Sequence, residues 1–147
     1  MDKDLNFLTL AKSSIAPAAH TATTSSEVVV DCAEAESLTV IVPVGVVATA
    51  DASNFFTFTV LMGDVADGSD ATAVDSSAYL NPKSGAGVLW DRVINATTEG
   101  SQVYQFGVKN LRSNRYAFVR ATETETASAI FGAMILLGNR RHNEAAV

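Results

Sequence analysis

The sequence is poor in the residues from which most catalytic and metal sites are built. Its 147 residues include one cysteine and two histidines. That cysteine and the distant His20 and His142 cannot supply the usual ligand set of a zinc site. Histidine catalysis needs a partner beside a positioned ring, and we expect both histidines to be solvated in terminal segments of low order. The sequence also has no phosphate-binding glycine loop and no Gly-x-Ser-x-Gly elbow. We therefore expect no enzymatic activity and no cofactor or metal.

A lone cysteine also excludes an internal disulfide. Cys32 follows the apolar run Val28 to Val30 and Asp31. A free cysteine packs like a small apolar side chain, and apolar surroundings keep its thiol protonated and unreactive. We therefore expect Cys32 to be buried and structural rather than reactive.

Long hydrophobic runs are missing as well. The most apolar stretch, Ala129 to Leu137, has 9 residues, about half of what a membrane-spanning helix requires. The first 20 residues mix acid and base and lack a convincing signal peptide. We expect a soluble protein assembled in the cytosol, without a membrane partner. The net charge of -6 argues against a nucleic-acid partner.

What the sequence does contain is β-strand pattern. Residues 1–26 are rich in Ala, Ser and Thr and show little periodicity, so we predict an extended N-terminal arm there. Residues 27–147 then hold about eight short β-branched or alternating segments separated by turn residues. These segments are 27–32, 37–47, 54–63, 71–74, 88–95, 101–110, 116–123 and 128–139. This spacing predicts an all-β fold, a sandwich or jelly roll of antiparallel strands.

Three segments carry more specific expectations. Pro43, inside the segment 37–47, indicates an edge strand or a bulge. The segment 128–139 also contains good helix formers, but Gly132 and the lack of a polar face favour a strand. A strand that is apolar on both faces belongs in the middle of a sheet or at an interface. Trp90, the one tryptophan, lies in an apolar segment and is expected in the core.

Charge is unevenly distributed along the chain. Residues 1–82 carry 2 basic and 11 acidic side chains, and residues 83–147 carry 8 basic and 5 acidic ones. The acidic loop with Asp64, Asp67 and Asp70 does not fit a calcium loop, so a solvated loop is the first interpretation and a weak cation site the second. The basic residues Arg112, Arg115, Arg140, Arg141 and His142 form a candidate contact surface for an acidic partner. The alternative is that Arg140 and Arg141 only keep the end of an apolar strand soluble.

The C-terminal pattern resembles a known family. In small head proteins of tailed bacteriophages, a hairpin of the type YxVGYxGxxRYVRV precedes an ending of the type AVLGxPRxAP. The matching stretches here are Tyr104 to Arg120 and Ala133 to His142, and Leu38 to Gly45 is similar to an earlier strand of the same proteins. Asn139 stands where proline is common. The resemblance covers about 40 residues of this chain and part of one earlier strand.

The resemblance implies a capsid decoration or cement protein, which is a virion protein on the capsid exterior, assembled in the cytoplasm of the host bacterium. It implies the major capsid protein as a partner and a homo-oligomer, a dimer or trimer. Two other functions remain open from the sequence. One is a neck or tail protein of the phage, which would share the architecture. The other is a β-sandwich binding module, for example for carbohydrate, which would need a row of exposed aromatic residues.

Overall fold

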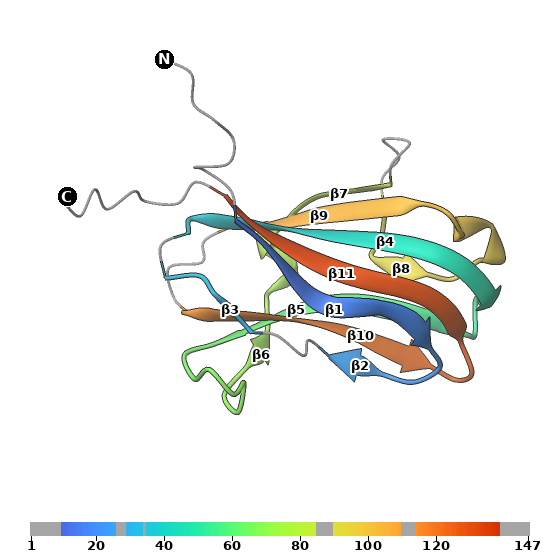
Figure 1. The fold of residues 1–147 in the computed structure, drawn as a ribbon, viewed down its shortest axis with the longest axis horizontal. Coiled ribbons are helices and arrows are strands. Elements are labelled where there is room, and N and C mark those ends of the chain that lie inside the picture. Colours follow the sequence, from blue (N-terminus) through green and yellow to red (C-terminus); the bar gives the residue numbers. More distant parts are fainter. Residues whose placement is uncertain (1–9, 26–28, 34, 85–89, 110–113, 139–147) are drawn as a thin grey trace, which may run out of the picture.

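The computed structural model describes residues 10–25, 29–33, 35–84, 90–109 and 114–138. The described chain forms two antiparallel β-sheets packed face to face, with short 3-10 turns and no α-helix among the described residues (Figure 1). The predicted β-sandwich is therefore confirmed. Within this part of the chain, no helix has the length and hydropathy needed to cross a membrane.

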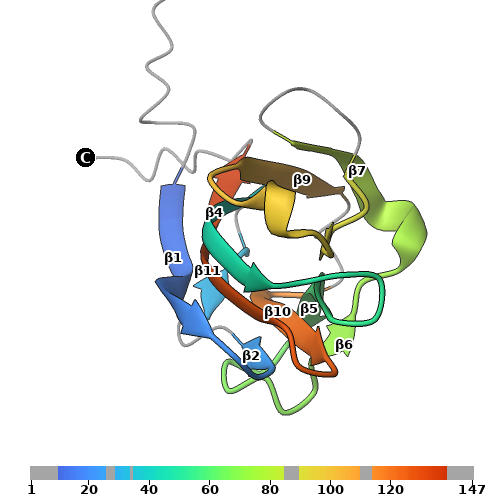
Figure 2. The ribbon, with the colours of Figure 1, turned by 90° about the vertical axis from the view of Figure 1, so that its right-hand side faces the viewer.

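One of the two sheets has five strands in the order β1-β11-β4-β9-β7. Their bounds are β1 Leu10–His20, β11 Ser128–Gly138, β4 Ser37–Thr49, β9 Val103–Lys109 and β7 Tyr79–Ser84. Every pair of neighbours is antiparallel. Seen from the end of the molecule, this sheet curves around the second sheet, with β1 at one margin and β7 at the other (Figure 2).

The second sheet is built on two long strands, β10 (Tyr116–Thr124) and β5 (Phe55–Gly63). Short strands complete its margins. Along β10 run β2 (Thr24–Ser25) and β3 (Val30–Asp31). Along β5 run β6 (Thr72–Ala73) and β8 (Val93–Ile94). The 3-10 turns Ser76–Ala78 and Thr97–Glu99 lie in the connections before β7 and β9.

All eight predicted segments contain a strand, and the described residues form three more that the sequence pattern did not indicate. One is β7, which lies in a stretch read as loop. The other two lie in the predicted arm: β1, which pairs with β11 over most of its length, and the short β2, which pairs with β10. The described part of the predicted arm thus contributes strands to the sheets and is not a loosely attached segment. Residues 1–9 lie outside the described residues, and the division into an arm and a sandwich domain stays a prediction.

Of the two alternatives expected for Pro43, the edge strand is wrong and the bulge is confirmed. Its strand, β4, lies in the middle of the five-stranded sheet and not at an edge. A proline is tolerated there because Pro43 pairs with Val103, the first residue of β9, where that ladder begins. The register with β11 shifts just beyond, between Val44 and Val47, so the bulge that the proline suggested does lie next to it.

The core between the sheets consists of the inward positions of each strand. The sequences of β5, β9 and β10 alternate, and in each strand one of the two alternating faces is buried: Phe56, Phe58, Val60 and Met62; Tyr104, Phe106 and Val108; Ala117, Val119 and Ala121. Phe131 of β11 is the aromatic centre of this core. Its ring lies 5.0 Å from Phe56 and 5.1 Å from Phe58, both edge to face. The contact therefore joins the two sheets.

Trp90 is buried, as predicted, at 5 % exposure. Its ring stacks on Tyr104 at 4.3 Å, and its indole N–H donates to the carbonyl oxygen of Val93 at 2.7 Å. Cys32 is also buried, as predicted.

Replacing Phe131 by alanine should destabilise the fold strongly, because the cavity would lie between the two sheets. We expect a loss of about 3–5 kcal/mol in the free energy of unfolding. The matched control is Ile130→Ala, one residue earlier on the outward side of β11 at 42 % exposure, with an expected loss below about 1 kcal/mol. Urea unfolding of both variants measures the difference. Equal losses would show that the core is not centred on Phe131.

Candidate interaction surface

Of the five residues predicted to contact a partner, the structure describes one. Arg115 lies just before β10, and its Nη2 and Nε donate to Oδ2 of Asp31 at 2.7 and 3.1 Å. Its backbone N–H donates to Asp64 at 3.1 Å. The guanidinium beside Asp31 holds the pKa of that carboxyl below its ordinary value. Arg115 thus has a structural role in tying β3 to β10.

The other four predicted contact residues lie outside the described residues: Arg112, Arg140, Arg141 and His142. The partner contact assigned to all five stays a prediction. Arg92, which the sequence did not single out, also binds within the chain, with its guanidinium 3.7 Å from the centre of the Tyr79 ring.

His20 does not match its expectation as a solvated side chain in an arm. Its ring stacks on Phe131 at 4.3 Å, and its Nε2 lies 3.2 Å from the carbonyl oxygen of Phe131. The pairing of β1 with β11 places it there, since His20 lies opposite Ala129. His20 therefore closes the core at the end of β1.

Several loop aspartates accept hydrogen bonds from backbone N–H groups of their own loops. Asp70 accepts from the backbone N–H groups of Asp64 and Val65, and Asp67 accepts from that of Ser69. Asp51 accepts in the same way from Ser53 and Asn54. Such bonds fix tight turns. Among the described residues, no group of three or more His, Cys, Asp or Glu side chains is arranged to hold a metal ion.

The outer face of the five-stranded sheet carries exposed apolar side chains among the described residues. Registers between β11, β4 and β9 place outward residues in rows across the strands. One row is Met134, Ile41 and Gln105; the next is Leu136, Thr39 and Gly107, continued by Leu80 of β7. A third contains Pro43 and Val103, and Ile130 lies beside the bulge at Gly45 and Val46. We call these outward residues of β11, β4, β9 and Leu80 the apolar face.

Exposure and charge distinguish the apolar face. Five of its large apolar side chains are between 37 % and 64 % exposed: Val46, Leu80, Val103, Ile130 and Met134. Among the outward positions of β11, β4 and β9, the charged residue is Lys109, at a corner, in the row with Ser37 and Gly138. A contiguous apolar patch of this kind marks an interaction surface more often than scattered exposed residues do.

The outer side of the second sheet differs. Leu61 of β5 is 7 % exposed, and a Cβ built on Gly68 in the loop after β5 would lie 3.0 Å from the Phe118 ring of β10. The chain's own loop therefore covers part of that sheet. Arg120 and the threonines of β5 and β10 make the rest polar. On the apolar face, β1 covers the middle of β11: an added Cβ on Gly132 would lie 3.0 Å from Cγ of Pro17. On either side of this point, Ile130 and Met134 remain exposed.

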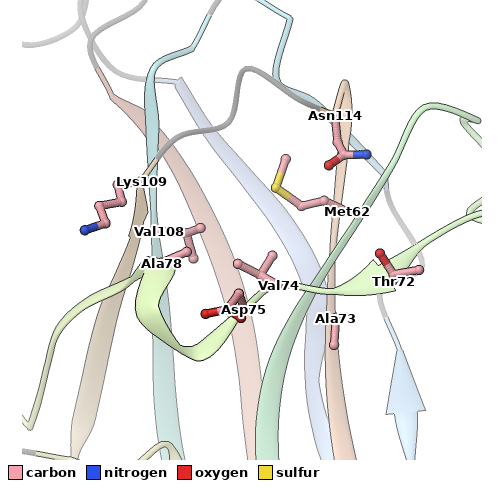
Figure 3. A pocket seen from close by; sticks show the side chains of 9 residues that line it. All are labelled: Met62, Thr72, Ala73, Val74, Asp75, Ala78, Val108, Lys109 and Asn114. Atoms are coloured by element: carbon pink, nitrogen blue, oxygen red, sulfur yellow. The ribbon is translucent and has the colours of Figure 1, made fainter.

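The described residues line two hollows near the surface. One, of about 220 Å³, opens at the end of the sandwich, with Met62, Val74 and Val108 at its apolar side and Asp75, Lys109 and Asn114 around it (Figure 3). The other, of about 290 Å³, lies on the apolar face over Gly107, between Leu80, Thr39 and Gln105. It exists because Gly107 has no side chain; an added Cβ would lie 3.3 Å from Cβ of Leu80.

Both edge strands of the five-stranded sheet contain a proline. Pro17 lies in β1 and Pro82 in β7, the two edge strands. Proline lacks a backbone donor, and its presence in an edge strand discourages pairing with another chain. Association through the edges of this sheet is therefore disfavoured, whereas its face is accessible.

Comparisons with known proteins add little. No protein-family model and no curated protein matches the chain. Among solved structures, the SPBc2 prophage-derived protein YomS aligns with a TM-score of 0.45 at 9 % identity, over 86 % of this chain and 92 % of that one.

Cys32 should be unreactive in the folded protein. Burial, and next the charge of Asp31, raises the pKa of its thiol to about 12, so the thiolate that reacts with disulfide reagents is almost absent at neutral pH. We expect reaction with a chromogenic disulfide only after unfolding in denaturant. Rapid reaction in the native state would contradict the buried position.

Acid should weaken the aspartate-built loops. Hydrogen bonds from Ser53, Ser69 and Ser77 lower the pKa values of Asp51, Asp67 and Asp75, respectively, below 3.8. The folded state then binds fewer protons than the unfolded state near that pH, so this stability is present above about pH 4 and is lost as pH falls through the lower, folded-state values. The melting temperature of the protein should therefore decrease when the pH is lowered below about 4.

The control for this acid effect is the triple variant Asp51→Asn, Asp67→Asn, Asp75→Asn. The amides keep an acceptor oxygen but do not titrate, so its melting temperature should depend less on pH between about 2 and 5. Identical pH profiles of the two proteins would remove the loops as the cause.

Proposed function

We propose that this chain is a non-enzymatic structural protein of a tailed bacteriophage particle, bound to the outside of the capsid shell as a decoration protein. The observation that carries the proposal is the apolar face, together with the head-protein pattern from Tyr104 to His142. The face spans several strands, and Lys109 is the charged residue among its outward positions on β11, β4 and β9. Lys83 of the edge strand β7 pairs with Gln105 at the margin of the face. These properties suit contact with another protein surface.

The fold suits such a role physically. A decoration protein occupies many equivalent positions, so weak contacts with fixed geometry add up through multivalency. The two sheets, joined by Phe131 and by the Trp90–Tyr104 stack, give a rigid body that keeps those contacts in register. On this proposal the major capsid protein contacts the basic residues Arg112, Arg115, Arg140, Arg141 and His142, and the apolar face supplies a further protein contact.

A neck or tail position is the second candidate within the virion, because the same architecture and apolar face would serve it. A carbohydrate-binding module is less well supported. Trp90, the residue most suited to stack on a sugar, is buried on Tyr104.

Copy number separates these functions. Particles of the phage that encodes the chain are purified, and the chain is quantified by mass spectrometry against the major capsid protein. The proposal predicts a ratio near one per capsid subunit or a simple fraction of it. A few copies per particle would move the protein to the neck or tail, and its absence from particles would overturn the virion function altogether.

A further inference from the structure

The apolar face is large enough for a modest protein contact. The three strands of the face, β11, β4 and β9, have 11, 13 and 7 residues. At about 4.8 Å between strands and about 3.4 Å per residue they cover roughly 500 Å². A standard stable interface buries about 800 Å² per partner. Because the sheet curves around its neighbour (Figure 2), two such faces would bury less than this full area. The contact that the face can make is therefore weak and reversible.

The strand order makes the face complementary to itself. In the order β1-β11-β4-β9-β7, β4 is the middle strand. Consider two copies whose apolar faces are stacked on each other, with a twofold axis that runs parallel to β4 midway between the two sheets. This axis places β11 of one copy opposite β9 of the other. Because the axis is parallel to the strands, residues in the same row of the sheet remain in the same row across the interface. Leu136 and Gly107 share one row across Thr39, so Leu136 of one copy faces the hollow over Gly107 of the other.

Charge fits the same arrangement. A twofold interface must match its own surface. The outward positions of β11 and β4 carry no charged residue, so the centre of the interface buries no unpaired charge. The corner residue Lys109 shares a row with Ser37 and Gly138, so it faces Gly138 of the second copy and not the other lysine. The prolines in β1 and β7 disfavour the competing route, which is pairing of sheet edges.

We propose that a second copy of this chain covers the apolar face, giving a twofold dimer in which two five-stranded sheets stack with β4 at the axis. The proposal of a dimer does not depend on the proposed virion function. Given the modest and curved area, we expect a weak dimer that dissociates on dilution.

Sedimentation equilibrium tests the dimer with the full chain, from about 1 to about 300 µM. The wild type should shift from monomer to dimer over this range. Met134→Lys places a charge in the middle of the face, at a site 38 % exposed, and should remain monomeric throughout. Val65→Lys is the matched control: Val65 is 44 % exposed but lies in the loop after β5, away from the face. It should dimerise like the wild type.

Each outcome decides the proposal. A wild type that stays monomeric at every concentration overturns it and leaves the face to another protein, such as a capsid subunit. Dimerisation that survives Met134→Lys places the interface elsewhere and also overturns it. Circular dichroism shows whether Met134→Lys is folded. If it is not, Ile130→Lys, which changes another exposed residue of the face, replaces it and is also expected to remain monomeric.

Discussion

The structure depends on one strand that is apolar on both of its faces. β11 pairs with β1 on one side and β4 on the other. Its inward residues Phe131, Ala133 and Ile135 are buried against the second sheet, so the hydrophobic contact of β11 holds the sandwich together. Its outward residues Ile130 and Met134 remain exposed. A strand needs only one apolar face to hold a sandwich, and the second apolar face is what suggests a partner.

Close approach to β11 also explains features that look like irregularities. The register of β1 shifts on both sides of Ile15, and Gly132 lies beneath: an added Cβ there would come within 3.1 Å of the Ile15 carbonyl oxygen. The glycine that interrupts the apolar run of the sequence is thus the place where β1 crosses closely over β11. The loops, in contrast, are shaped by aspartates that accept backbone N–H groups. The apolar strands therefore set the fold, and the acidic residues set its turns.

Much of the fold could be predicted from local pattern. Alternating burial in β5, β9 and β10, the strand state of β11 and the burial of Trp90 follow from side-chain periodicity and composition. β1 could not be predicted, because its sequence LAKSSIAPAAH has no alternation; it is a strand only because the edge of β11 offers it hydrogen bonds. The position of His20 follows from that pairing. The apolar face was foreseeable on β11, but its neighbours Pro43 and Val103 depend on the register between strands, which no local pattern gives.

Oxidation of methionine tests directly whether the apolar face is an interface. Met134 lies on the face at 38 % exposure, and Met62 is buried in the core at 6 %, so Met62 serves as the internal reference. Brief peroxide treatment, limited to about one event per chain, is followed by mass spectrometry on dilute and concentrated protein. The account predicts that Met134 is oxidised readily in dilute solution and protected at high concentration, whereas Met62 is protected in both. Equal oxidation of Met134 at both concentrations would contradict it.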